Sequence, residues 1–402
     1  CFRVSATNNA RISTLEHRVA EIHFSSHWPI IPTLTTVVWD AFLFYALLRD
    51  HNERGTCLSF DNKGDQVTRL DAALRARNML MVGPARENWN HVCDKCCATK
   101  EVNGEFSVIR AAVMDGVTVG RPCCNVHDCQ EELPSQRARF CSTHSSMSGL
   151  CVVIGCIEAL ASTRFNTCPR PTHHELEDVT GHSALFQHRR HLERLKMRTH
   201  EDDDQGVTEE LLAVDADGET EDADGRVETS KESGCQKALE QLVVTPCGTM
   251  LARATFFGSE AMNGTRVSFL HVVYPTPRSV PQALFYDTAC NFQKHTRRVN
   301  DRHFAVPVDT FHMKTKHKES DDFCGQYCDP DMFPDLLVDN RWRFNSSTAE
   351  MTNGYHAIAK EMRALRYDFF LDEMIKLRNR MIVEELHRVG ANPLEVPREF
   401  IL

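Results

Sequence analysis

The sequence lacks the long apolar run and the nucleotide- or acyl-binding motifs that define several large protein classes. No apolar stretch approaches the roughly 18–20 residues of a membrane-spanning helix, and no signal-peptide pattern opens the chain, so we expect no membrane partner. There is no Walker A loop, GxSxG elbow or GxGxxG turn, which argues against ATP-binding, acyl-transfer and dinucleotide-binding proteins. The chain starts on Cys1 instead of Met, and we therefore expect a fragment or an incomplete gene model.

Basic residues are missing from one segment, residues 201–224, which holds twelve acidic side chains and no Lys or Arg. Without these twelve charges the formal net charge of −10 becomes +2, so the rest of the chain is close to neutral. A segment that is acidic and poor in large apolar residues cannot bury enough surface to join a core. We expect residues 201–232 to be a disordered acidic linker.

Cysteine is abundant, with 17 residues, and a dense cysteine/histidine array follows the strand-like run FSVIRAAVMDG. Three cysteines separated by four and then eleven residues are followed by a histidine, and the same spacing of cysteines recurs after six residues. Thiolates and imidazole in this number saturate a tetrahedral zinc ion in a closed structural site. The array predicts two zinc ions, with the ligands Cys124, Cys129, Cys141, His144, Cys151, Cys156, Cys168 and His173.

Several alternatives remain open for this array. The ligands can pair consecutively or in a cross-braced arrangement, and Cys123, His127 and His174 lie close enough in sequence to replace a neighbour. Buried free cysteines or disulfides are the competing interpretation, but the repeated spacing favours metal and a reducing compartment. A ubiquitin-ligase RING also uses eight ligands, but it prefers two-residue gaps where this array has four.

Two smaller sets have metal-like spacing. The run WNHVCDKCC places His91, Cys93, Cys96 and Cys97 close together, as a further zinc site or as surface thiols. Downstream, four residues separated by gaps of four, six and three could close another structural zinc site. They are His312, His317, Cys324 and Cys328. The alternative is that these histidines, with the lysines among them, line a loop that faces DNA.

Three carboxylates have the placement of a two-metal phosphoryl-transfer site. Asp115 and Asp287 each close an apolar strand-like run, and Glu350 lies in the first turn of an expected helix. Mg²⁺ or Mn²⁺ ions held about 3.5–4 Å apart by carboxylates can clamp the attacking and leaving oxygens of an in-line displacement. The competing interpretation is that these residues are a turn residue at each strand end and a dipole partner at the helix start, which are common roles for acidic side chains.

Apolar periodicity predicts an α/β fold. Helices are expected at residues 37–51 and 67–81, and one or two long helices, broken near Tyr367, at residues 347–388. Residues 106–120 are expected to begin a β-hairpin, and further strands are expected around the Cys-Gly turn of LVVTPCGTMLARATFF and in PQALFYDTACNF. Basic side chains after Asp287 can hold backbone phosphates or form a solvated helix face. They are Lys294, Arg297, Arg298 and Arg302.

Taken in order, these motifs resemble the KDZ (Kyakuja–Dileera–Zisupton) transposases, and more narrowly their fungal branch with CxC-like cysteine clusters. The resemblance rests on DGVTVGRPCCNVHDC, CSTH, TCPRPTHHELE, YDTACNF, DTFHMKTKHKESDDFCGQYCDP and RFNSSTAEMTN, and it spans about residues 39–379. It implies a nuclear DNA-binding enzyme with an RNase H-like core, a mixed sheet flanked by helices, that cuts and joins DNA with Mg²⁺ or Mn²⁺. It also implies a homo-oligomer on transposon ends and a DDE-type site made by Asp115, Asp287 and Glu350.

The resemblance also implies a domain order. We expect a helical N-terminal region at 1–100 that ends in the CDKCC cluster, and the first core strands at 101–122. A zinc-binding insertion at 123–200 and the acidic linker would follow, and the rest of the core with the His/Cys block and C-terminal helices would occupy 233–402. The chain departs from the family where GCQKALEQL replaces a THNE-like stretch, and CDKCC resembles the end of a longer cluster. The alternative is therefore a degenerate or domesticated zinc- and DNA-binding protein without activity.

Overall fold

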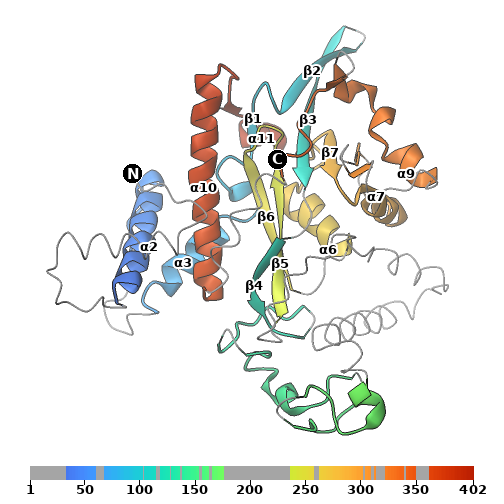
Figure 1. Cartoon of the computed structure of the whole chain (residues 1–402). Coiled ribbons are helices and arrows are strands. Elements are labelled where there is room, and N and C mark those ends of the chain that lie inside the picture. The colour runs from blue at the N-terminus through green and yellow to red at the C-terminus, as the bar shows by residue number, and fades with distance from the viewer. Residues whose placement is uncertain are drawn as a thin grey trace, which may run out of the picture. The chain divides into compact units, whose positions relative to one another are not determined.

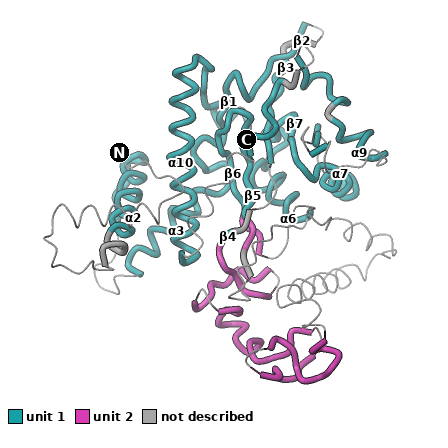
Figure 2. The backbone as a smooth tube through the Cα atoms, in the orientation of Figure 1, with its two compact units in different colours: residues 1–120, 240–254, 261–402 teal, residues 121–239, 255–260 magenta. Residues whose placement is uncertain are grey.

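The computed structural model describes residues 33–59, 68–102, 104–114, 118–126, 128–135, 138–153, 156–162, 165–175, 236–257, 262–301, 304–308, 312–313, 322–338, 341–349 and 362–402. The chain divides into two compact units, shown in different colours in Figure 2. Unit 1 comprises residues 1–120, 240–254 and 261–402, and unit 2 comprises residues 121–239 and 255–260. Unit 2 thus interrupts unit 1 twice along the sequence. The predicted linker at 201–232 lies outside the described residues, and the predicted domain boundaries remain predictions.

A mixed sheet forms the centre of the fold (Figure 1). Its strands are β2 (Cys97–Val102), β3 (Glu105–Met114), β4 (Thr118–Cys123), β5 (Gln236–Val244), β6 (Met250–Phe256) and β7 (Ala283–Tyr286). Strand β3 pairs antiparallel with β2 and β5 and parallel with β7. Strands β4 and β6 both pair with β5. The parallel pair aligns the carboxyl ends of β3 and β7 at the same edge.

Helices, 3-10 turns and two-residue strands make up the rest of the described secondary structure. Among the described residues, unit 1 has the helices α2 (Thr33–Glu53), α3 (Asp71–Met79), α6 (Met262–Val267), α7 (Ala289–Arg298), α9 (Asp322–Tyr327), α10 (Ala364–Arg388) and α11 (Arg398–Ile401), with the π-helical turn η3 (Ser268–Val273). The 3-10 turns are η1 (Gly83–Ala85), η2 (Ser145–Gly149), η4 (Pro330–Met332) and η5 (Pro334–Leu336). Two-residue strands pair as β1 (His91–Val92) with β10 (Leu394–Glu395), and as β8 (Leu337–Val338) with β9 (Arg341–Trp342).

Apolar side chains cover both faces of the sheet within unit 1. Successive residues of β3 point to opposite faces, so that Met114 packs in one cluster with Phe292 of α7, and Val113 packs in the other with Ile375 of α10. A strand that is buried on both faces has a continuous apolar sequence and not an alternating one. This explains the run IRAAVM in β3 and ALFY in β7.

The two expected N-terminal helices are present as α2 and α3, and they pack with α10. Leu47 of α2, Leu74 of α3 and Phe369 of α10 share one apolar cluster and are fully buried. Helix α10 begins at Ala364, close to the break expected near Tyr367. The described residues therefore form a mixed α/β fold with helices packed against strands.

Helix α10 also buries charged side chains. Arg253 Nε on β6 donates to Asp372 Oδ1 at 2.9 Å, and the Arg86 guanidinium donates to the same carboxylate. At the next position of the helix, Arg77 Nη2 donates to Glu373 Oε2 at 2.9 Å. All five side chains are more than nine-tenths buried. Charges in such surroundings are tolerated only because each one has an opposite partner.

Unit 2 has a small core made largely of its cysteines. Cys124, Cys129 and Cys141 are buried with Phe140, and Val126, Leu133 and Met147 pack against them. An apolar cluster of this size contributes little stability by burial alone, and small domains of this kind are usually held by metal or disulfides. The cysteines that form the core of unit 2 are therefore its candidate metal ligands.

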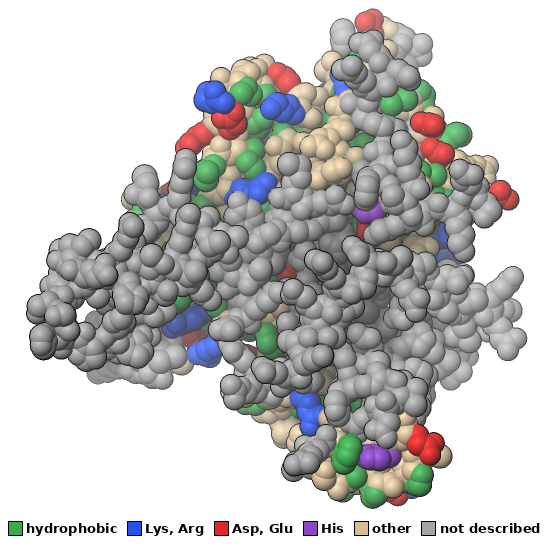
Figure 3. Space-filling model, viewed as in Figure 1, with side chains coloured by type: hydrophobic (Ala, Val, Ile, Leu, Met, Phe, Trp, Pro, Cys, Tyr) green, Lys and Arg blue, Asp and Glu red, His purple; other side chains and the backbone are tan. Residues whose placement is uncertain are grey.

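The described surface carries charges of both signs. On the face shown in Figure 3, the described basic and acidic side chains are interspersed, and neither sign forms a continuous patch there. Within the described part of the chain, no helix is both long enough and apolar enough to cross a membrane.

Candidate metal centres

The first half of the cysteine/histidine array comes together in unit 2. Cys124 directly follows β4, and a turn in which the His144 N–H donates to the Cys141 carbonyl at 3.2 Å places these two side chains side by side. His144 Nδ1 lies 3.3 Å from Cys141 Sγ and 3.6 Å from Cys124 Sγ. The Sγ atoms of Cys129 and Cys141 are 3.7 Å apart. We call these four residues the first centre.

The second half of the array repeats this geometry. His173 Nδ1 lies 3.2 Å from Cys168 Sγ and 3.6 Å from Cys151 Sγ. The Sγ atoms of Cys156 and Cys168 are 3.8 Å apart. These four residues form the second centre. The same ring nitrogen and the same pair of cysteines are used in both copies, so the repeat in sequence is also a repeat in structure.

The distances between ligand atoms in both centres are those expected around a zinc ion. A tetrahedral ion with Zn–S bonds of about 2.3 Å separates two sulfur atoms by about 3.8 Å, whereas a disulfide brings them to about 2.05 Å. In each centre the four ligand atoms lie within 4.8 Å of one another. The ligands are therefore grouped consecutively, one centre from each copy of the repeat, and both centres can hold a metal such as zinc.

Backbone N–H groups favour the thiolate form that a metal needs. The backbone N–H of Glu158 lowers the pKa of the Cys156 thiol. Burial raises the pKa of Cys141, but hydrogen bonds from the His144 backbone and from Cys129 outweigh it, so that the pKa falls below its ordinary value. The loops therefore favour the thiolate at Cys141 and Cys156, whereas burial raises the pKa of Cys129 and Cys168.

Three neighbours of the array were candidates to replace a ligand. Cys123 is buried at the end of β4, outside both groups of converging ligand atoms. His174 packs edge-on against Phe165, with ring centroids 4.2 Å apart, and its Nδ1 lies 3.4 Å from Thr167 Oγ1. His127 lies outside the described residues. The structure therefore places the eight predicted side chains, and neither Cys123 nor His174, around the two centres.

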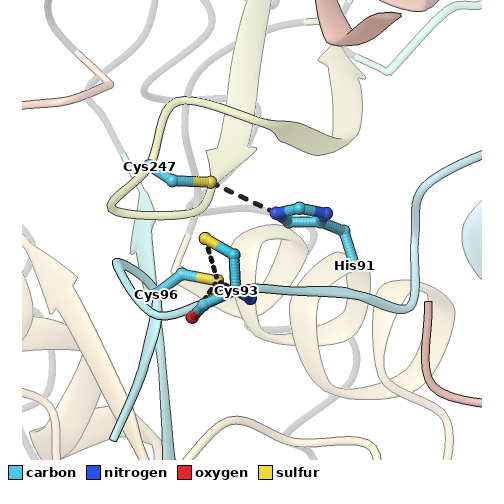
Figure 4. Close-up of side chains that lie close together, drawn as sticks. All are labelled: His91, Cys93, Cys96 and Cys247. Carbon is cyan, nitrogen blue, oxygen red and sulfur yellow. Dashed lines mark hydrogen bonds between the residues drawn. The ribbon is translucent and has the colours of Figure 1, made fainter. Parts of the chain in front are cut away.

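A third centre lies in unit 1, and its fourth ligand differs from the one suggested by the sequence (Figure 4). His91, Cys93 and Cys96 converge with Cys247, whose Sγ lies 3.3 Å from His91 Nε2. Cys97, the nearest alternative in sequence, is not in the group. Burial lowers the pKa of His91, but the Cys247 and Cys93 thiols outweigh burial and raise it to about 9.

Of the three predicted carboxylates, only Asp287 lies among the described residues. It follows β7 directly, is half-buried, and accepts a hydrogen bond at 2.8 Å from the N–H of Thr288, the residue before α7. Asp115 and Glu350 lie outside the described residues. Their convergence with Asp287 remains a prediction.

The predicted His/Cys block downstream of Asp287 is described in part. Cys324 and Cys328 are fully buried in the apolar cluster of α7, and Cys324 Sγ lies 4.0 Å from Met313 Sδ. His312 is buried as well. Among the described residues these three side chains do not form a group with ligand atoms within 4.8 Å. His317 lies outside the described residues, so a zinc ion at the full set stays a prediction.

Two of the basic side chains on α7 lie against aromatic rings of α9. The Arg297 guanidinium is 4.0 Å from the centre of the Tyr327 ring, and Lys294 Nζ is 5.1 Å from that of Phe323. Such contacts hold the cationic groups at the protein surface without removing their charge. Arg298 is exposed at the end of the helix, and Arg302 lies outside the described residues.

Comparison with known proteins connects the two centres of unit 2 to one family. Residues 113–179 match the family model described as a CxC6-like cysteine cluster associated with KDZ transposases. This segment contains all eight ligands of the first and second centres. Neither a curated protein nor a solved structure matches the chain. The match covers the segment from the end of β3 to residue 179, and this part of the chain is similar to the CxC6-like cysteine clusters associated with KDZ transposases.

Proposed function

We propose that the chain is a DNA transposase of the KDZ type, which cleaves and joins phosphodiester bonds with Mg²⁺ or Mn²⁺ ions held by a DDE-type set of carboxylates. The site would lie at the carboxyl ends of β3 and β7, with Asp287 as one metal ligand. Asp115 and Glu350 are the other predicted members. DNA is the proposed partner and the nucleus the proposed location, with assembly of several copies on transposon ends.

The register of β3 and β7 is the observation that supports this proposal most directly. The two strands are parallel, and Met114, the last residue of β3, pairs with Tyr286, the last residue of β7. The next residues in the sequence are Asp115 and Asp287. Ligands of open α/β sheets are commonly bound beyond the carboxyl ends of adjacent parallel strands. Two acidic residues that follow paired strand ends therefore suit a shared metal site.

The order of strands also suits an RNase H-like core. Strand β3 lies between β5, its antiparallel neighbour, and β7, its parallel neighbour, and β6 extends the sheet beyond β5. The bridge between Ala283 and Ala305 adds a further parallel segment beside β7. In an RNase H-like sheet the first strand is likewise flanked by an antiparallel hairpin on one side and parallel strands on the other.

The proposed chemistry assigns separate roles to protein and metal. When bound, divalent ions would polarise the scissile phosphate and would activate water or a DNA 3′-hydroxyl. Asp287 supplies a hard anionic oxygen for such an ion, and the hydrogen bond from Thr288 fixes its orientation. Because little covalent chemistry falls to the protein, positioning and charge decide the rate.

Substitution of Asp287 tests the proposal. Asp287→Asn keeps nearly the same volume but removes the charge, so Mn²⁺-dependent nicking of supercoiled DNA should fall by about 10²-fold or more. Asp331→Asn, an exposed carboxylate in the same unit, is the matched control and should nick DNA like the wild type. Equal activity of Asp287→Asn and the wild type would contradict the proposed role.

One sequence feature favours a second candidate, a zinc- and DNA-binding protein without catalytic activity. The chain has GCQKALEQL where the family often has a THNE-like stretch. Such a protein would retain DNA in a salt-dependent manner but would not cut it with any divalent metal. Retention without cleavage by the wild type therefore identifies this second function.

A further inference from the structure

We propose that the third centre is a closed structural zinc site that ties strand β1 to the β5–β6 hairpin. Its ligands are His91, Cys93, Cys96 and Cys247. The proposal does not rest on the transposase function, because a structural ion would serve an active and an inactive chain equally. It concerns residues outside the matched segment 113–179.

The distances in the third centre are those of a tetrahedral metal site. Cys93 and Cys96 Sγ are 3.5 Å apart, and Cys247 Sγ is 3.3 Å from His91 Nε2. Around zinc, with bonds of about 2.3 Å to sulfur and 2.0–2.1 Å to nitrogen, these edges are about 3.8 and 3.6 Å. The observed edges are each about 0.3 Å shorter than these values, so a small expansion brings the four atoms to the geometry of a zinc site. A disulfide would instead need the two sulfur atoms to approach to about 2.05 Å.

Burial makes the centre structural and not catalytic. Three of its ligands are nearly inaccessible, with His91 5%, Cys93 4% and Cys96 1% exposed, and Cys247 is half-buried. Four protein ligands fill the coordination sphere of zinc, whereas a catalytic zinc keeps one position for water or substrate. The chemistry of this centre is therefore to hold parts of the chain together.

A tight turn presents Cys247 to the other three ligands. The Gly248 N–H donates to the Thr245 carbonyl at 2.9 Å, and the Thr245 N–H donates to the Thr249 carbonyl at 2.8 Å. Pro246 occupies the second position of this turn, which its fixed φ suits, and Gly248 follows with a φ of +98°. A three-residue hairpin loop of this type needs a residue with positive φ after the turn. The sequence TPCGT thus fixes the position of the cysteine.

Polar groups around the sulfur atoms support a thiolate cluster. The hydroxyl oxygens of Thr245 and Thr249 lie 2.9 and 3.3 Å from Cys247 Sγ. The backbone N–H of Cys93 donates to Cys96 Sγ at 3.1 Å. Such outer contacts orient metal ligands and stabilise their charge.

The centre joins segments that are far apart in sequence. His91 and Cys247 are separated by 156 positions, and the cluster packs against Leu386 and Ala391 at the end of α10. The Asp94 N–H donates to the Ala391 carbonyl at 3.0 Å. A zinc ion here would hold the segment 91–96, the β5–β6 hairpin and the end of α10 together at one point.

The CxxC spacing of Cys93 and Cys96 suggests a competing role as a redox dithiol. Such a pair needs neither His91 nor Cys247, and it would join the two sulfur atoms in a disulfide when oxidised. A redox dithiol would therefore leave the convergence of His91 and Cys247 with the two cysteines unexplained. Zinc accounts for all four side chains.

Metal analysis of the full chain, purified under reducing conditions with zinc, tests the proposal. Cys247→Ser should contain one zinc ion fewer than the wild type, because serine is a poor zinc ligand. Cys97→Ser is the matched control, since Cys97 is adjacent to the centre but not part of it, and its zinc content should equal that of the wild type. An unchanged zinc content in Cys247→Ser, or the same loss in Cys97→Ser, would overturn the assignment.

If Cys247→Ser does not fold, thiol labelling of the wild-type protein tests the proposal. Its thiols are alkylated before and after addition of a chelator, and each site is read by mass spectrometry of peptides. Cys93, Cys96 and Cys247 should become reactive together on chelation, whereas Cys290, buried away from every centre, should keep its reactivity. A Cys93–Cys96 disulfide, or no change at these three thiols on chelation, would overturn the proposal.

Discussion

Removal of the buried carboxylate of Asp372 should strongly destabilise unit 1. Asp372 is 2% exposed and accepts hydrogen bonds from Arg86 and Arg253, which are buried with it. Arg253 keeps two other carboxylate partners, Glu240 and Asp368, when Asp372 becomes asparagine. Arg86 keeps only a backbone carbonyl as a partner among the described contacts, so its charge is left without compensation.

The expected magnitude follows from this arrangement. Removing one member of a buried ion pair costs about 3–5 kcal/mol, most of which is the penalty for the charge that remains. For a domain of about 280 residues, a loss of this size lowers the melting temperature by on the order of 10 °C. Thermal unfolding followed by near-UV circular dichroism measures the difference between Asp372→Asn and the wild type.

A matched control separates burial from charge. Glu385→Gln removes a carboxylate from the same helix, but its partner Arg388 is exposed, so water solvates the charge that remains. The control should unfold like the wild type. If Asp372→Asn also unfolds within about 1 kcal/mol of the wild type, the argument from buried charge is wrong.

The pH dependence gives an independent check. Burial raises the pKa of Asp372, but the charges of Arg253 and Arg86 outweigh it and hold the pKa below its ordinary value. A carboxylate with a lowered pKa stabilises the fold fully above its unfolded pKa of about 3.9, and it loses this contribution as the pH falls through the folded value. The difference between wild type and Asp372→Asn should therefore be constant above about pH 5 and should shrink in stronger acid.

Two further predictions concern a metal centre and a turn. His144→Ala should remove the zinc of the first centre and leave that of the second, as metal analysis would show; loss of both would indicate that the centres are coupled. Gly83→Ala should lower the free energy of unfolding by about 1–3 kcal/mol, because Gly83 has a φ of +56° and a Cβ would lie 2.4 Å from the Val272 carbonyl oxygen. Gly55→Ala, with a φ of +64° and nothing within 4 Å, is the control for φ alone and should cost less in the same denaturant titration.

The sequence predicted those features that depend on short-range order. The first and second centres were found because each set of ligands recurs at a fixed local spacing, and their consecutive grouping is the simpler of the two pairings considered. The end of β7 before Asp287 was predicted because an apolar run stops there. The helices α2 and α3 were predicted from their apolar periodicity.

Features that depend on distant parts of the chain were not predicted. Cys247 was missed because it is 156 positions from His91, and Cys97 offered a nearer fourth ligand. The Cys-Gly turn that holds it was noticed, but nothing local shows that the turn faces the other three residues. The buried charges Asp372 and Glu373 were missed as well, because acidic residues in a helix normally mark its solvated face.

The position of unit 2 between β3 and β5 has a consequence for the order of folding. Met114 pairs with Val243, so the sheet cannot close until a loop of about 130 residues brings its ends together. Zinc binding at the first and second centres ties up residues 124–173 and shortens the free part of this loop to about 80 residues. The entropy saved is about 0.4 kcal/mol, which accelerates closure by a factor of about two. Metal supply should therefore change the speed at which the central strands meet only slightly.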